Sequence, residues 1–361
     1  MMTKMKTPLH QKHCDLGARM VDFNGWEMPL KYTSILDEHR AVRTNAGIFD
    51  VSHMGRVLFQ GPEAEKFVDY ISTNRIVGKL DGTATYTVFL NESGGAVDDA
   101  IIYKEGPTSF FTVVNAGNRK KDLDHFLEIS KNFDVSVIHR YDADGILAVQ
   151  GPKALPLIHE IFPETESLKP FQFMTVSVNG EKVIVSRTGY TGEEGAELYA
   201  PLSIIPNLWD LFMDKGKTYD LQPIGLGARD TLRLEMGYAL YGHELSDTIS
   251  PLESVSSWTI KLKDRNFYGK EALVSLKENG KRRHTYAVVL KDKGIAREGY
   301  SVFFGNEEIG IVTSGTMSPS TQQAIALILV KKPFEKGDEV TIQVRNKMCP
   351  AEIVSLPFYK S

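Results

Sequence analysis

The sequence predicts an α+β fold of more than one domain that ends in a small all-β domain. Two observations carry this prediction. Segments 57–71 and 146–161 read alike, each an apolar strand followed by a Gln-Gly-Pro turn and a helix, and Gln60 and Gln150 lie 90 residues apart. Beyond residue 284, short strand-like runs are separated by Gly, Pro and Asn, which is typical of a small barrel or sandwich. We therefore expect two related α+β lobes followed by a β domain.

The other elements of the body follow from local patterns. Strands are expected at 85–90, 97–103, 110–115, 174–178 and 182–186. Asn91–Gly95 and Asn179-Gly180 are hairpin signals between consecutive strands. Apolar residues near helical spacing predict a helix over 119–131, and 226–240 again has helical character.

A change of composition separates the body from the β domain. The run 276–284 is polar and charged, and is expected to be a linker or an exposed loop. Strands are then expected at 285–290, 300–304, 309–313, 325–330, 340–344 and 351–354. This places a body of two interleaved α+β lobes at 1–275 and a C-terminal β domain at 276–361.

Composition excludes several classes of protein. The 361 residues carry a formal net charge of −4, which does not favour a general nucleic-acid binder. Two cysteines cannot form a disulfide framework or a CxxC metal knuckle, and no apolar run reaches the length of a membrane span. Without a signal-peptide pattern, we expect a reduced, soluble, cytoplasmic protein that binds neither nucleic acid nor membrane. Signatures of P-loop NTPases, HExxH metalloproteases and GxSxG hydrolases are absent, so any chemistry is expected to be metal-free.

An acidic pair opens the strand expected at 97–103. Side chains alternate along a strand, so Asp98 and Asp99 should point to opposite faces, with Tyr103 on the face of Asp99. A carboxylate that points inward needs a pairing or ligand partner. The alternative is a hairpin acid that only caps a turn.

Two further segments carry groups suited to binding. Segment 186–198 contains three glycines, the flat and polar side chain of Tyr190, and Glu197; alternatively it is a long surface hairpin. In 225–235, Arg229 and Arg233 lie four residues apart on one helix face, where like charges need a counter-ion or an anionic ligand. The alternative is a structural helix whose arginine pairs with Glu235 or with a distant acid.

Taken together, these segments resemble the aminomethyltransferase, or T protein, family of the glycine cleavage system. The segments that carry the resemblance are 7–9, 17–23, 25–29, 38–43, 49–55, 94–99, 186–193, 225–235, 240–242 and 313–316. Each segment alone is a weak signal, whereas their number and order along nearly the whole chain are specific.

The resemblance implies a fold and a reaction. The fold would be a multi-domain cloverleaf with a C-terminal β-barrel-like domain. In the reaction, a lipoylated H protein would present an aminomethyl group on its lipoyl sulfur. The enzyme would pass the one-carbon unit to tetrahydrofolate, with 5,10-methylenetetrahydrofolate, ammonia and dihydrolipoyl-H protein as products, and no metal would take part.

The resemblance also assigns residues by position in the matching motifs. Asp99 matches the family's key carboxylate near the reacting end of folate and is the expected catalytic residue. Glu197 and Arg229 match pterin and substrate contacts, and Tyr190 matches an aromatic that lines the folate site. The remaining expected folate-lining positions are Met54, Leu58, Tyr86, Ile101, Tyr103 and Asn115.

Three other functions remain open from the sequence. A related folate-dependent demethylase would use the same pocket, although the Asp-Asp, Glu and Arg segments match the T-protein pattern. A non-catalytic folate-binding homologue of the kind linked to iron–sulfur cluster repair would carry a characteristic cysteine motif, whereas Cys14 and Cys349 lie outside the central motifs. A purely structural role is the third.

Overall fold

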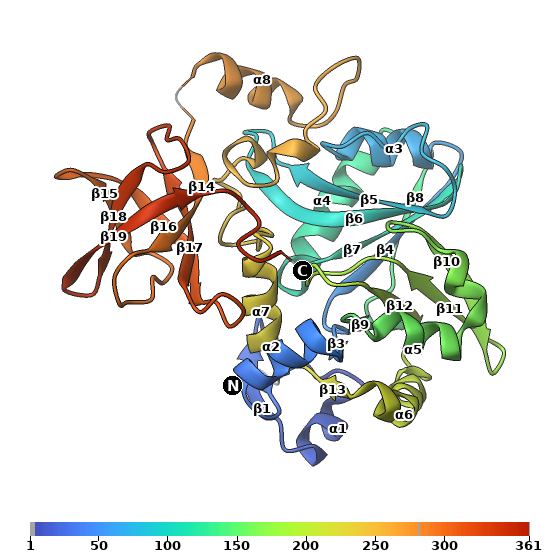
Figure 1. The fold of residues 1–361 in the computed structure, drawn as a ribbon. Coiled ribbons are helices and arrows are strands. Elements are labelled where there is room, and N and C mark those ends of the chain that lie inside the picture. Colours follow the sequence, from blue (N-terminus) through green and yellow to red (C-terminus); the bar gives the residue numbers. More distant parts are fainter. Residues whose placement is uncertain (1–3, 281, 361) are drawn as a thin grey trace. The chain divides into compact units, whose positions relative to one another are not determined.

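The computed structural model describes residues 4–280 and 282–360 (Figure 1). The chain forms two compact units. The first unit comprises the chain up to Val68 together with Ile76–Thr85 and Ala100–Asp230. The second comprises Asp69–Arg75, Tyr86–Asp99 and the chain from Thr231 onward.

Helices and strands alternate along most of the chain. The α-helices are α1 (His10–Asp15), α2 (Ile35–Thr44), α3 (Ala64–Ile71), α4 (Arg119–Ser130), α5 (Ala154–Ile161), α6 (Ile205–Lys215), α7 (Leu226–Glu235) and α8 (Lys270–Glu278). The strands up to the middle of the chain are β1 (Arg19–Phe23), β2 (Trp26–Lys31), β3 (Ala46–Asp50), β4 (Gly55–Gln60), β5 (Thr83–Leu90), β6 (Ala96–Gly106), β7 (Ser109–Val114), β8 (Ser136–His139) and β9 (Asp144–Gln150). The later strands are β10 (Phe173–Val178), β11 (Glu181–Ser186), β12 (Gly195–Pro201), β13 (Leu221–Pro223), β14 (His284–Leu290), β15 (Ser301–Phe304), β16 (Glu307–Met317), β17 (Ala324–Val330), β18 (Glu339–Val344) and β19 (Lys347–Val354).

A six-stranded sheet in the first unit has the order β10-β11-β12-β9-β3-β13. Alternate residues of its central strands, such as Ile48, Val149 and Leu198, belong to one buried core that also holds Leu157 of α5 and Trp209 of α6. Because side chains alternate across a strand, the residues between them face the other side of the sheet. That other side carries the candidate site described below.

The predicted repeat is present and extends further than its sequence signal. The second sheet has the order β5-β6-β7-β4-β8. Strands β5, β6 and β7 form a three-strand meander, and β4 lies beside the last of them, β7. The strands β9 to β12 repeat this arrangement, because β9 lies beside β12 in the order β10-β11-β12-β9. The helices α3 and α5 follow β4 and β9 at equivalent places. The two segments therefore share a strand order and a following helix, whereas the division of the body into two lobes stays a prediction.

The Gln-Gly-Pro turns need glycine in both copies. Gly61 has φ +150° and Gly151 has φ +131°, a region that side-chain-bearing residues rarely adopt. A Cβ on either glycine would lie 2.5 Å from a backbone oxygen, of Asp134 or Asn45 respectively. Each proline lies in the turn, and the helix begins two residues later.

The C-terminal strands close into a barrel in the order β14-β17-β16-β15-β18-β19, drawn in orange to red in Figure 1. The barrel closes because β14 pairs with both β17 and β19. Its interior is apolar, with Val288, Val312, Ile328 and Ile342 fully buried. Of the two architectures expected for this region, the barrel is the one that forms.

Two expected boundaries differ from the structure. The polar run expected as a linker begins inside α8, which continues to Glu278. The helix expected over 226–240 ends at Glu235, because Gly237 adopts φ +71° and breaks the helix. The division of the chain at residue 275 stays a prediction. No helix within the described residues is long and apolar enough to cross a membrane.

Candidate active site

A hollow opens on the polar side of the six-stranded sheet in the first unit. Its lining residues are Phe49, Val51, Ala148, Gln150, Tyr190, Thr191, Glu197 and Arg229. The empty space between them, including open solvent at the mouth, is about 240 Å³.

The floor of the hollow is one row of residues across neighbouring strands. Glu197 of β12 pairs with Ala148 of β9, and Ala148 pairs with Phe49 of β3. Ser186 of β11 extends the row beyond Glu197. Directly paired residues point to the same face, so the sheet register brings these side chains together. The small Ala148 in the middle leaves room above the floor.

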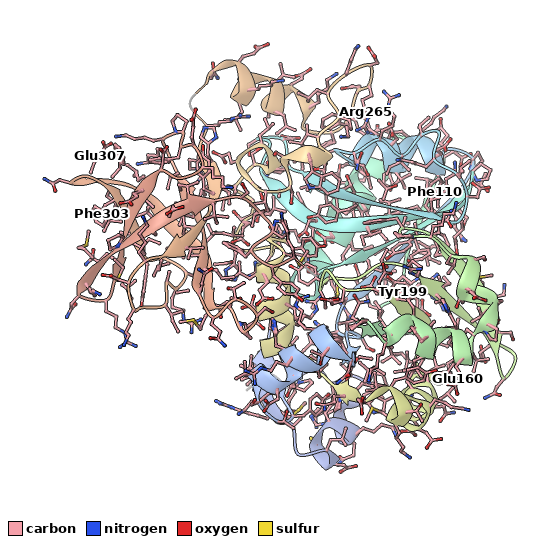
Figure 2. The ribbon with its side chains drawn as sticks, in the orientation of Figure 1. Phe110, Glu160, Tyr199, Arg265, Phe303 and Glu307 are labelled. Atoms are coloured by element: carbon pink, nitrogen blue, oxygen red, sulfur yellow. The ribbon has the colours of Figure 1, made fainter. Side chains whose placement is uncertain are left out.

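Glu197 is held by hydroxyl groups on one of its two carboxylate oxygens. Its Oε2 lies 2.6 Å from Thr188 Oγ1, 2.8 Å from the Tyr199 hydroxyl and 3.4 Å from the Tyr103 hydroxyl. Tyr199 belongs to β12, two residues beyond Glu197 (Figure 2). Within the described part of the chain, Oε1 takes no hydrogen bond, and Glu197 lines the hollow. The carboxylate is thus anchored at one oxygen and available at the other.

The loop between β11 and β12 is tied to the sheet by Gln150. Its Nε2 donates to the Thr188 carbonyl (3.2 Å), and its Oε1 accepts from Thr191 Oγ1 (3.1 Å). A Cβ at position 189 would lie 1.9 Å from Gln150 Oε1, so Gly189 is required for this close approach. These bonds fix the loop that carries Tyr190.

An arginine forms the cationic side of the hollow. The guanidinium of Arg229 lies 4.6 Å from the centre of the Tyr190 ring, which is a cation–π distance. Burial, followed by the charge of Arg229, lowers the pKa of His53 from its usual value to about 3. His53 is therefore neutral at physiological pH and adds no charge beside Arg229.

Asp99 lies in the second unit, where a tyrosine orients it. The Tyr86 hydroxyl donates to Asp99 Oδ2 (2.8 Å) and lies 3.2 Å from Ser256 Oγ. The ring of Tyr86 stacks on Trp258, with centroids 5.7 Å apart, and Trp258 is 58% exposed. The predicted residues Tyr86 and Asp99 therefore share one hydrogen-bonded cluster.

Of the acidic pair, Asp98 is fully buried and Asp99 is half-buried. The prediction that one acid faces inward therefore fits Asp98. Neither acid is exposed.

The structure places the other predicted folate-lining residues within the first unit. Leu58 and Tyr103 both pair with Phe111, so they share one face of the five-stranded sheet with Ile101, which lies two residues before Tyr103. Tyr103 itself is fully buried and contacts Glu197 through its hydroxyl.

Met54 and Asn115 lie at strand ends of the same unit. Met54 precedes β4, and its carbonyl accepts from Arg119 (2.6 Å). Asn115 follows β7 and is half-buried. The structure thus gathers Tyr190, Glu197 and Arg229 around the hollow. The folate-binding roles of these three residues, and of the six other predicted folate-lining residues, stay predictions.

The two arginines of α7 take different partners. Arg233 is buried and pairs with Glu244, its Nη1 lying 3.2 Å from Glu244 Oε2, so the interpretation as a structural ion pair with a distant acid is confirmed for this residue. Glu235 instead accepts from Ser318 and Ser320. Arg229 has the pocket position described above.

Sequence reasoning missed the groups that support the predicted residues. Thr188 lies inside a segment that was singled out, but nothing distinguished it from its neighbours. Tyr199 could have been found because it is two residues from Glu197 on the same strand, and hence on the same face. Gln150 belongs to the repeated Gln-Gly-Pro turn, so its side-chain role was hidden by its turn role.

The hollow offers complementary binding groups. Glu197 accepts hydrogen bonds, Arg229 donates them, and Phe49 and Tyr190 supply flat apolar walls. Among the residues that the structure describes, no group of three or more His, Cys, Asp or Glu side chains is placed to hold a metal ion.

Comparisons with known proteins cover nearly the whole chain. Residues 9–264 match the family model described as GCVT N-terminal domain, and residues 282–360 match the glycine cleavage T-protein C-terminal barrel domain. Aminomethyltransferases of Thermotoga maritima (44% identical over 357 residues, 98% of each chain) and Rubrobacter xylanophilus (45% over 360 residues, 99% of this chain and 95% of the relative) are similar in sequence. The crystal structure of glycine cleavage system aminomethyltransferase T from Bartonella henselae is similar in fold, with a TM-score of 0.92, 30% identity and 98% of each chain covered.

Proposed function

This chain belongs to the glycine cleavage T-protein family, and from that premise we propose that it is a tetrahydrofolate-dependent aminomethyltransferase. It takes the one-carbon unit from the aminomethyl-lipoyl arm of an H protein and transfers it to tetrahydrofolate. The products are 5,10-methylenetetrahydrofolate, ammonia and dihydrolipoyl-H protein. The observation that carries the proposal is the hollow lined by Tyr190, Glu197 and Arg229, the three positions at which the family motifs place folate-binding groups.

The chemistry of these side chains suits a pterin ring. The edge of a pterin presents an amine and a ring N–H as donors beside a carbonyl acceptor. The available Oε1 of Glu197 accepts from such donors, and the Arg229 guanidinium donates to the carbonyl. The ring faces of Phe49 and Tyr190 bound the flat heterocycle.

We assign the catalytic role to Asp99. Breaking the C–S bond of the aminomethyl-lipoyl group develops positive charge on the departing one-carbon unit. A carboxylate held in place beforehand stabilises that charge, because it needs no reorientation as the charge forms. The hydrogen bond from Tyr86 supports this preorganisation of Asp99.

The remaining assignments extend the same proposal. Met54, Leu58, Tyr86, Ile101, Tyr103 and Asn115 are proposed to line the folate site. Residues 1–275 form the folate-binding body and 276–361 the barrel domain. The enzyme acts in the cytoplasm with a lipoylated H protein as its partner, without a metal, nucleic acid or membrane.

A direct assay tests the proposed function. The full-length protein is mixed with aminomethylated H protein and tetrahydrofolate, and both ammonia and 5,10-methylenetetrahydrofolate are measured. Formation of both products in equal amounts, dependent on each substrate, is the expected result. If an H protein that another T protein turns over yields neither product, the proposal is wrong. Binding of folate without turnover would equally contradict an aminomethyltransferase.

A further inference from the structure

We propose that two buried hydroxyl donors, Thr188 and Tyr199, the second supported by Tyr103, converge on Glu197 Oε2 and position its Oε1 for the ligand. The inference rests on the proposed function, since it concerns the same pocket. The three hydroxyl-bearing side chains act as positioning residues, because each acts on the ligand through Glu197. All four residues belong to the first unit.

Counting protons fixes the direction of the tyrosine chain. Each hydroxyl donates one proton. The bond from Tyr199 to Glu197 Oε2 (2.8 Å) uses the Tyr199 proton, so the 2.6 Å contact between the two tyrosine oxygens requires Tyr103 to donate to Tyr199. The longer 3.4 Å contact from Tyr103 to Glu197 is then a secondary one. Tyr103 therefore strengthens the Tyr199 donor rather than replacing it.

The same counting applies to the second donor. Thr188 Oγ1 donates to Glu197 Oε2 at 2.6 Å, and Ser186 Oγ lies 3.1 Å away as a second acceptor for the same hydroxyl. The shorter contact takes the single Thr188 proton. Thr188 and Tyr199 therefore donate to the same carboxylate oxygen, which leaves the other oxygen to the hollow.

Burial keeps the tyrosine hydroxyls in their donor state. Tyr103 and Tyr199 are at most 2% exposed. Burial first, and then the charge of Glu197, raises the pKa of the hydroxyls of Tyr103 and Tyr199 well above the usual value of tyrosine. Ring contacts also restrain the pair, because Tyr103 stacks on Phe111 with centroids 4.3 Å apart. The hydroxyl groups are thus neutral, immobile donors.

The test uses substitutions that remove hydroxyls while keeping shape. Tyr199→Phe and Thr188→Val each delete one donor to Glu197, and Thr188→Ser restores the hydroxyl. Tyr219→Phe is the matched control, because it removes a tyrosine–carboxylate bond to Glu160 (2.9 Å) outside the hollow. The dissociation constant of tetrahydrofolate is measured by calorimetry for each full-length variant. Each variant is first checked for an unchanged circular dichroism spectrum.

A weakening of about tenfold or more is expected for Tyr199→Phe and for Thr188→Val, from the typical strength of hydrogen bonds to charged groups. Thr188→Ser and Tyr219→Phe should bind like the wild type. In a Glu197→Ala background, Tyr199→Phe should change the affinity less than about twofold, because the group it positions is gone.

The outcomes separate this inference from the proposed function. Equal weakening by Tyr199→Phe in both backgrounds would show a general packing effect and overturn the inference. Wild-type affinity in both Tyr199→Phe and Thr188→Val would also overturn it. Absence of tetrahydrofolate binding by the wild-type protein would instead overturn the proposed folate site, and this inference with it.

Discussion

A fully buried hydrogen bond between a histidine and a carboxylate connects α1 to the strand that ends at the hollow. His13 Nε2 lies 2.9 Å from Asp50 Oδ2, and neither side chain is exposed. The Tyr32 hydroxyl lies 2.8 Å from the other ring nitrogen of His13. Asp50 stands between Phe49 and Val51, both of which line the hollow. We predict that His13→Ala strongly destabilises the first unit, because it leaves the Asp50 carboxylate buried without this hydrogen-bond partner.

The magnitude follows from this complete burial. Removing one partner of a buried pair costs about 3–5 kcal/mol. For a domain of 150–250 residues, each kcal/mol lowers the melting temperature by about 2–4 °C, so a loss of about 6–20 °C is expected. The double variant His13→Ala/Asp50→Asn should recover part of the loss, since no buried charge remains.

The contribution of Asp50 to the stability of the protein depends on pH, and the sign of this dependence can be worked out. Burial alone would raise the pKa of Asp50, but its interaction with His13, together with a hydrogen bond from the Ser52 backbone N–H, lowers it below the usual value. A carboxyl whose pKa is lowered by folding stabilises the protein above its unfolded pKa of about 3.9. That stability is lost as the pH falls through the folded pKa.

Neighbouring residues of the same helix supply the control. Lys12 pairs with Asp210 at 2.7 Å, but the two side chains are 33% and 61% exposed. Lys12→Ala should therefore cost at most about 1 kcal/mol. Thermal unfolding followed by circular dichroism at pH 7 compares the variants. If His13→Ala melts no lower than Lys12→Ala, the reasoning about the buried pair is refuted.

Four further predictions concern the site and its supports. Asp99→Asn should lower the rate of methylenetetrahydrofolate formation about 10²–10³-fold in the H-protein assay, and an unchanged rate would remove Asp99 from the chemistry. Arg229→Lys should weaken tetrahydrofolate binding about tenfold in calorimetry, since lysine lacks the planar guanidinium; equal affinity would contradict its role. The pKa of His53 is lowered to about 3 in the folded protein, so below about pH 6.5 the unfolded state binds a proton that the folded state does not. The protein should therefore lose up to about 1.4 kcal/mol of stability per pH unit as the pH falls below about 6.5, and His53→Asn should make the melting temperature less dependent on pH. Gly151→Ala should lower the melting temperature more than Gly180→Ala, where nothing lies within 4 Å of the new Cβ; equal losses would contradict the close approach.

Local sequence patterns predicted the elements well. Asn179 and Gly180 adopt φ of +52° and +85°, the conformation that a two-residue hairpin turn requires. The same holds for the repeated turns, because Gly61 and Gly151 take positive φ in both copies. These features depend on a few adjacent residues, so the sequence alone contains the information.

Contacts between distant segments could not be predicted in the same way. The row that joins Phe49, Ala148 and Glu197 depends on the register of three strands that are far apart along the chain. The pairing of Arg233 with Glu244 was expected only in kind, as an ion pair with some distant acid. Neither spacing nor composition specifies which acid it is.

This difference explains why motifs located ligand-facing residues but not the groups that hold them. A motif is a contiguous stretch, whereas the donors to Glu197 come from three separate places: Thr188 in a loop, Tyr199 on the same strand and Tyr103 on a strand of the other sheet. A carboxylate whose orientation is already fixed through one oxygen loses little further rotamer freedom when its other oxygen binds a donor. The affinity of the hollow therefore depends on residues that only the folded sheets bring together.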